Sequence, residues 1–135
     1  MAFEMEGDTV RNIEIRRATE KDAPVIAQAV AMAIGHDSSV NYCGENYLEV
    51  LTEVAQLAGT QYSYANSLVA SVDGEPAGAL CGYDGAALDE LRAGTLAVVN
   101  KYNLLDGPID DETQPGEFYL DSIGVMPQYR GLGIG

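Results

Sequence analysis

The end of the chain carries the pattern that most constrains the fold. Residues 118–125 form a β-type run, and Pro127 follows, which cannot donate a backbone hydrogen bond and so ends a sheet ladder. Glycines then stand at positions 131, 133 and 135, beside Arg130. Glycine lets the backbone approach a ligand closely, and amides freed at a helix start bind anions. The pattern predicts a pyrophosphate-binding loop between a strand and a helix.

The composition is that of one folded domain. The chain has 135 residues, of which 21% are charged and 47% hydrophobic, so a packed core is expected rather than disorder. Seven basic residues stand against 21 acidic ones, a net charge of −14. This balance argues against nucleic acid and anionic membranes as partners. It favours a cationic partner such as an amine, although acidity that serves only solubility explains it equally well.

The sequence also bears on location. No apolar stretch approaches the roughly 20 residues that cross a bilayer, and the acidic N-terminus lacks a signal-peptide core. Cys43 and Cys81 do not have the spacing of a Cys-x-x-Cys motif. We expect buried, reduced thiols, a cytoplasmic protein and no metal site, with residues 1–11 as a flexible tail.

Hydrophobic periodicity and turn residues predict an α/β (α+β) domain with a mixed sheet. The expected order is a strand at 13–17, a helix that Thr19 begins and Gly35 ends, a helix at 45–58, strands at 67–72 and 77–83 joined by Asp73-Gly74, a helix inserted within 84–116, and the strand at 118–125. Small residues at 78, 79 and 82 indicate a closely packed neighbour.

The last strand and loop resemble motif A of the GNAT superfamily of N-acetyltransferases. The family signature is Gln/Arg-x-x-Gly-x-Gly/Ala, and Gln128-x-x-Gly131-x-Gly133 matches it; Leu120-x-x-Ile123-x-Val125-x-Pro127 fits the strand before it. The resemblance implies a GNAT-like mixed sheet, acetyl-CoA as cosubstrate and transfer of its acetyl group to an amine acceptor. The segment 84–116 departs from the family, which joins these two strands with a short turn.

The resemblance also assigns coenzyme-binding residues. It implies that backbone groups of Ile123 and Val125 bind the pantetheine arm and that the Val125 amide polarises the thioester carbonyl. Amides from residue 130 onward would hold the pyrophosphate, with the Arg130 side chain nearby. The expected coenzyme-binding residues are Ile123, Gly124, Val125, Gln128, Arg130, Gly131, Leu132, Gly133, Ile134 and Gly135. The alternative is a glycine-rich turn that binds nothing.

Two carboxylates are candidate general bases for the amine. Glu117 opens the motif strand, where some family members place such a glutamate, and Asp121 is expected to share a strand face with Glu117 and Ile123. The alternatives are a solvated strand-end carboxylate for Glu117 and a structural hydrogen bond for Asp121. The tyrosine that protonates the thiolate in the family follows motif A and has no counterpart here.

The resemblance covers the first part of a GNAT domain, from about residue 13 to residue 135. We therefore expect one incomplete domain that is inactive alone, and an exposed edge of the strand at 118–125 that favours self-association or pairing with a complementing chain. The alternative function is a non-catalytic, GNAT-like fragment that binds a ligand or a protein. The sequence does not identify the acceptor.

Overall fold

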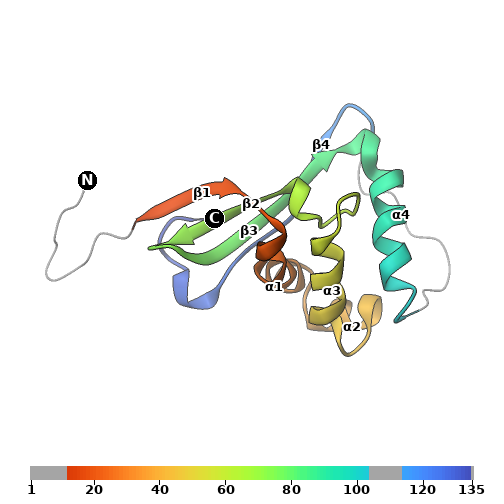
Figure 1. The fold of residues 1–135 in the computed structure, drawn as a ribbon, viewed down its shortest axis with the longest axis horizontal. Coiled ribbons are helices and arrows are strands. Elements are labelled where there is room, and N and C mark those ends of the chain that lie inside the picture. Colours follow the sequence, from red (N-terminus) through yellow and green to blue (C-terminus); the bar gives the residue numbers. More distant parts are fainter. Residues whose placement is uncertain (1–11, 104–113, 135) are drawn as a thin grey trace, which may run out of the picture.

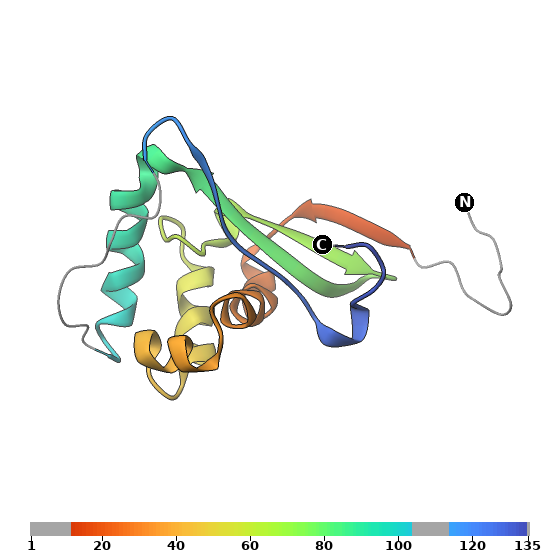
Figure 2. The ribbon, with the colours of Figure 1, turned by 180° about the vertical axis from the view of Figure 1, so that it is seen from behind.

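A four-stranded antiparallel sheet forms the centre of the molecule. The structure is a computed structural model that describes residues 12–103 and 114–134. The strands are β1 (Ile13–Arg17), β2 (Ser67–Val72), β3 (Glu75–Asp84) and β4 (Phe118–Val125), in the order β1-β2-β3-β4. Figures 1 and 2 show the helices gathered on one side of this sheet. The predicted α+β fold class and the predicted strands are confirmed, but all three strand pairings in the described residues are antiparallel, whereas the sequence predicted a mixed sheet.

The first strand leads into a helix through one ionic contact. The Thr19 backbone N–H donates to Asp22 Oδ2 at 2.7 Å, within a short 3-10 turn at Glu20–Asp22. The Arg16 guanidinium of β1 donates to both carboxylate oxygens of Asp22, at 2.7 and 2.9 Å. Hydrogen bonds from Arg16, and then from Thr19, hold the pKa of the buried Asp22 below its ordinary value. This contact fixes the start of α1 (Ala23–Ile34) against β1.

Three helices cover the core face, where the sequence predicted two. Gly35, with φ near +89°, ends α1 as expected, but α2 (His36–Cys43) follows at once, before α3 (Tyr47–Gln56). The expectation of a single helix between Gly35 and the hairpin is therefore wrong. α2 buries only Ser39 and Cys43, so it has no apolar stripe for a periodicity argument to find.

The hairpin and the inserted helix agree with the prediction. Asp73 and Gly74 both have positive φ, 51° and 86°, as a two-residue turn between twisted strands requires. The inserted helix is α4 (Leu88–Val99), which lies beside the end of β3 in Figure 1. The acidic loop expected around residues 106–116 falls mostly outside the described residues.

Both cysteines are free and buried, as predicted. Cys43 belongs to the core cluster beneath α1 and α3, and Cys81 lies on β3 with its Sγ 3.2 Å from Ser67 Oγ. Burial raises the pKa of each thiol to about 11. Within the described residues, every helix is too short or too polar to cross a membrane.

The Arg16–Asp22 contact predicts a pH-dependent stability. Because the folded pKa of Asp22 is depressed, its contribution is present above the unfolded pKa near 4 and is lost as pH falls through the lower, folded value. Asp22→Asn should therefore lower the free energy of unfolding by about 1–2 kcal/mol at pH 7, a value discounted for the half-exposed Arg16. Urea unfolding should show this difference shrinking below pH 4. An equal difference at pH 7 and pH 3 would contradict the role of the charge.

A second prediction concerns Gly94 in the middle of α4. Glycine costs a helix about 1 kcal/mol relative to alanine, so an open site would make Gly94→Ala stabilising. A Cβ at Gly94, however, would overlap the carbonyl oxygen of Gly59, which follows α3. We expect Gly94→Ala to destabilise by about 1–3 kcal/mol in urea unfolding. Ala93→Gly, on the exposed side of the same helix, measures the cost of glycine relative to alanine in α4 without any packing overlap. A stabilised Gly94→Ala variant would show that α4 does not pack this closely.

Candidate functional site

The site begins at a β-bulge in the middle of β4. Cys81 pairs with Ser122, whereas Gly82 pairs with Leu120, so Asp121 is the extra residue of β4. Ser122 is buried, and Ile123 is 52% exposed on the other face. The Asp121 carboxylate accepts a 2.8 Å hydrogen bond from the buried Tyr83 hydroxyl on the helix side. The prediction that Asp121 and Ile123 share a face is wrong, because the extra residue breaks the two-residue alternation.

Past the bulge, β4 runs closely across α1. A Cβ at Gly124 would lie 2.8 Å from both the Cα and the carbonyl oxygen of Ala29. A Cβ at Gly78, the β3 residue paired with Val125, would lie 2.5 Å from the Gly124 carbonyl oxygen. Only glycine fits at either position; the sequence predicted close packing at Gly78 but not at Gly124. The backbone of β4 is therefore held directly against α1.

Two backbone amides of β4 point toward an open edge. Among the described strands, β4 has a neighbour, β3, on one side only. The Met126 N–H donates to the Ala77 carbonyl oxygen at 2.7 Å. Hydrogen-bonded and non-hydrogen-bonded pairs alternate along an antiparallel ladder, so the next pair, Gly78 and Val125, is non-hydrogen-bonded. The N–H and C=O groups of Val125 therefore point away from β3. The same alternation turns the Ile123 backbone outward. Ile123 and Val125 are the residues that the sequence assigned to backbone contacts with an extended ligand.

The glycine-rich loop, residues 128–134 of the described chain, turns back toward this edge. A 3-10 turn at Pro127–Tyr129 follows β4. Gly131 and Gly133 have φ of 86° and 79°, and a Cβ at either would meet nothing within 4 Å. These glycines are needed for the positive φ of the loop and not for close packing, because open space lies where their side chains would be. Gly135 lies outside the described residues.

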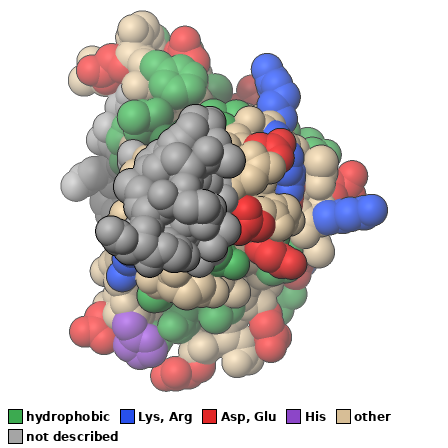
Figure 3. Space-filling model, turned by 90° about the vertical axis from the view of Figure 1, so that its left-hand side faces the viewer, with side chains coloured by type: hydrophobic (Ala, Val, Ile, Leu, Met, Phe, Trp, Pro, Cys, Tyr) green, Lys and Arg blue, Asp and Glu red, His purple; other side chains and the backbone are tan. Residues whose placement is uncertain are grey.

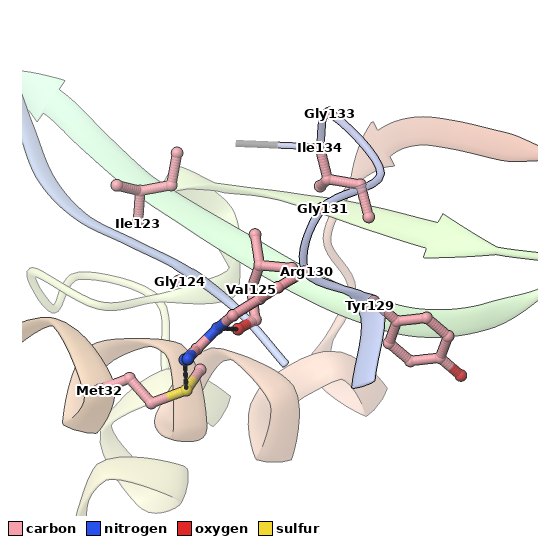
Figure 4. Close-up of a pocket in the computed structure, with 9 residues that line it drawn as sticks. All are labelled: Met32, Ile123, Gly124, Val125, Tyr129, Arg130, Gly131, Gly133 and Ile134. Atoms are coloured by element: carbon pink, nitrogen blue, oxygen red, sulfur yellow. Dashed lines mark hydrogen bonds between the residues drawn. The ribbon is translucent and has the colours of Figure 1, made fainter. Parts of the chain in front are cut away.

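A hollow of about 570 Å³ lies between the strand, the loop and α1. Figure 4 shows that Ile123 and Val125 from β4, Ile134 from the loop and Met32 from α1 surround it. Its lining residues are Met32, Ile123, Gly124, Val125, Tyr129, Arg130, Gly131, Gly133 and Ile134. Seven of the ten residues predicted to bind the coenzyme therefore line one hollow; Gln128 and Leu132 are exposed beside it.

Arg130 joins the loop to the strand and the helix. Its Nε donates to the Val125 carbonyl oxygen at 3.0 Å, and its Nη2 lies 3.3 Å from Met32 Sδ. Figure 4 shows the guanidinium turned back across the base of the loop toward α1. The side chain therefore closes the loop onto its own strand. The sequence placed Arg130 near the site but gave no indication of these two contacts.

Glu117 lies far from this hollow. Eight residues of extended strand separate it from Val125, roughly 26 Å at 3.3 Å per residue. Its exposed side chain accepts a 2.8 Å hydrogen bond from the Gln114 backbone N–H. Asp121 is nearer, since only two residues separate it from Ile123. The structure therefore does not bring together the two carboxylates that the sequence proposed.

Sequence reasoning missed Met32, Tyr83 and Gln61. Met32 reaches the hollow because α1 packs against Gly124 of β4 at Ala29, one helical turn before Met32. Tyr83 reaches Asp121 at the bulge, and Gln61 contacts Tyr83. Each contact depends on tertiary register, for which a single sequence carries no local signal.

Two solved structures resemble this chain. A protein described only as an acetyltransferase superposes with a TM-score of 0.76 and 30% sequence identity, over 90% of this chain and 67% of its own. The chain belongs to the acetyltransferases. An N-acetyltransferase from Staphylococcus aureus Mu50 superposes with a TM-score of 0.69 and 25% identity, over 90% of this chain and 69% of its own. No protein-family model and no curated protein sequence matches the chain.

These similarities confirm the resemblance that the motif segment indicated. The part of each solved structure that matches this acetyltransferase is about two thirds of that structure's length. The match extends over nearly all of the chain and is not confined to the glycine-rich loop. It supports acetyl transfer as the general activity, and the identity of the donor and the acceptor is a separate question.

Proposed function

We propose that this acetyltransferase takes its acetyl group from acetyl-CoA and transfers it to an amine. One observation carries the proposal: the open-edge amides of β4 and the exposed glycine-rich loop line the same hollow of about 570 Å³. That volume lies in the ordinary range for small-molecule sites. Acetyl-CoA supplies the acyl group already activated as a thioester.

The residues present suit the two ends of this ligand. The amide groups of a pantetheine arm need hydrogen-bond partners along an extended path, which the outward-facing backbone of Ile123 and Val125 offers. A pyrophosphate needs several N–H donors and no side chains in the way. The loop backbone around Gly131 and Gly133 meets the second requirement, because open space lies where their side chains would be.

The Val125 amide is our candidate for polarising the acyl carbonyl. A backbone N–H held in a strand is a preorganised donor, and such donors stabilise the negative charge that develops on oxygen during acyl transfer. The close packing of Gly124 on Ala29 and the Arg130 contact to the Val125 carbonyl fix the backbone on both sides of the Val125 Cα.

Two features favour an amine as the acceptor: the negative net charge of the chain and the position of the Asp121 carboxylate. The net charge of −14 attracts cationic substrates, and the amine must lose a proton before it attacks. Asp121 is the better candidate for that proton because it lies in β4 close to Ile123, whereas Glu117 lies at the far end. The two free, buried cysteines fit a reducing compartment, and we propose a cytoplasmic location.

The loop is tested by a matched pair of substitutions. Gly133→Asp and Gly133→Asn place nearly isosteric side chains at the same positive φ, which asparagine and aspartate both tolerate better than most residues. Aspartate adds a negative charge where the pyrophosphate would lie, so acetyl-CoA affinity should fall at least 100-fold, against less than tenfold for asparagine. Isothermal calorimetry measures both. Equal affinities for the two variants would place the coenzyme elsewhere.

Arg130 gives an independent test of how the loop is held. If the guanidinium acts through its contacts to Val125 O and Met32 Sδ, lysine cannot replace it, because an ammonium lacks the planar fork. Arg130→Lys should then weaken acetyl-CoA binding nearly as much as Arg130→Ala, by about tenfold. Full retention of affinity in Arg130→Lys would show instead that Arg130 contributes only its positive charge.

Activity distinguishes this proposal from a non-catalytic binding protein. The natural full-length protein is incubated with acetyl-CoA and a panel of primary amines, and acetylated products are detected by mass spectrometry. Acetylation of at least one amine that Gly133→Asp abolishes supports the enzyme. Tight coenzyme binding without transfer to any amine would favour the binding function.

A further inference from the structure

A chain of hydrogen bonds ends on Asp121. The Gln61 side-chain Nε2 donates to the Tyr83 hydroxyl oxygen at 3.1 Å, and the Tyr83 hydroxyl donates to Asp121 Oδ2 at 2.8 Å. Gln61 and Tyr83 are 3% and 4% exposed, whereas Asp121 is only half-buried. Two buried neutral groups therefore hold a carboxylate that solvent can reach.

The direction of the protons in this chain is fixed by chemistry. A side-chain amide N–H can only donate, so Gln61 occupies a lone pair of the Tyr83 oxygen. The one hydrogen of that hydroxyl is then directed to Asp121. A hydrogen bond to a carboxylate is stronger than one between neutral groups, so the Tyr83 hydroxyl holds the Asp121 side chain in one orientation.

The inserted helix anchors the far end of the chain. The Gln61 backbone N–H donates to Thr95 Oγ1 of α4 at 2.9 Å, and Thr95 Oγ1 donates to the Leu91 carbonyl oxygen at 3.2 Å. Thr95 is fully buried. The segment 84–116, which departs from the family pattern, therefore supplies the support for Gln61 and, through it, for Tyr83.

The bulge places the carboxylate at the end of this chain. Asp121 is the extra residue of β4, and bulges commonly re-aim a side chain beside an active site. Tyr83 is also fixed from the side, because its ring packs edge-on against Tyr119 with centroids 5.7 Å apart. The Tyr83 hydroxyl therefore has a donor, Gln61, on one side and a carboxylate, Asp121, on the other.

We propose that Tyr83 is a positioning residue that orients Asp121 to accept the proton of the acceptor amine. This inference rests on the proposed function. Tyr83 holds Oδ2, and Oδ1, which has Ser122 Oγ at 3.5 Å, takes the proton. The N–H bond of the acceptor breaks, its electron pair stays on nitrogen and attacks the acyl carbon, and the proton passes to Asp121 Oδ1. The C–S bond of the thioester then breaks, its electron pair leaves on sulfur, and the thiolate takes a proton from solvent. Gln61 keeps the Tyr83 hydroxyl pointed at the carboxylate.

A double-mutant cycle tests this dependence. Asp121→Asn should lower kcat by about 100-fold or more, the usual contribution of a general base. Tyr83→Phe should lower kcat by about tenfold, for the loss of one hydrogen bond to a charged group, and should leave the KM for acetyl-CoA unchanged. In the Asp121→Asn background, Tyr83→Phe should have no further effect on kcat.

The matched control is Tyr102→Phe. The Tyr102 hydroxyl donates to Glu53 Oε1 at 2.5 Å, a tyrosine–carboxylate pair at the exposed end of α4 that lies outside the site. This variant loses the same kind of hydrogen bond and should keep full kcat. Thermal unfolding is measured for each protein. If Tyr83→Phe fails to fold, Gln61→Met takes its place in the cycle, with an expected two- to threefold loss of kcat that also vanishes beside Asp121→Asn.

The outcomes are separable. An equal loss from Tyr83→Phe in both backgrounds would show that Tyr83 acts on the fold and not through Asp121, and would overturn the inference. Full kcat in Asp121→Asn would overturn it as well while leaving the proposed function intact. A wild-type protein that acetylates no amine would overturn the inference together with the proposed function.

Discussion

The contact between α1 and β4 sets the geometry of the rest of the molecule. At Gly124 the strand backbone passes so near Ala29 that one additional carbon would overlap the helix backbone. The helix can approach only because that carbon is missing. One turn further along, the same helix presents Met32 to the hollow and to the Arg130 guanidinium. The position of the glycine-rich loop over α1 therefore follows from a crossing that two small residues permit.

The two halves of β4 have different surroundings. At the bulge, the helix side of the strand carries the Asp121 carboxylate, which connects through Tyr83 of β3 and Gln61 to α4. After the bulge, the strand carries apolar side chains, outward-facing amides and the loop. One extra residue thus separates the carboxylate on the helix side of the strand from the outward-facing amides and the exposed Ile123.

The sequence predicted the parts of this arrangement that depend on local signals. The Asp73-Gly74 turn, the helix end at Gly35 and the strand before Pro127 are each set by backbone preferences within a few residues, and each is present. The glycine pattern likewise marked the loop. Gly131 and Gly133 both have positive φ, which glycine tolerates by its own chemistry, so the pattern could be interpreted without knowing a tertiary neighbour.

The parts that failed depend on register and on distant contacts. α2 has no apolar stripe, because little of it is buried. The bulge at Asp121 follows from how β3 and β4 align, and strict alternation misplaced Ile123 relative to it. A glycine inside a helix ordinarily weakens it, whereas Gly94 is the point where α4 meets Gly59. A single sequence shows that a residue is small but not which neighbouring residue leaves no room for a larger one.

The state of the cysteines has a practical consequence for enzymology. Cys43 and Cys81 are the only cysteines of the chain, each is about 1% exposed, and burial raises both thiol pKa values to about 11. A thiol reacts with disulfide reagents and maleimides as its thiolate and when it can be reached, and neither condition holds here at neutral pH. Acyl transfer from a thioester releases one free thiol per turnover. A colorimetric thiol reagent added to the native protein should therefore count turnovers against a background that the protein itself hardly raises.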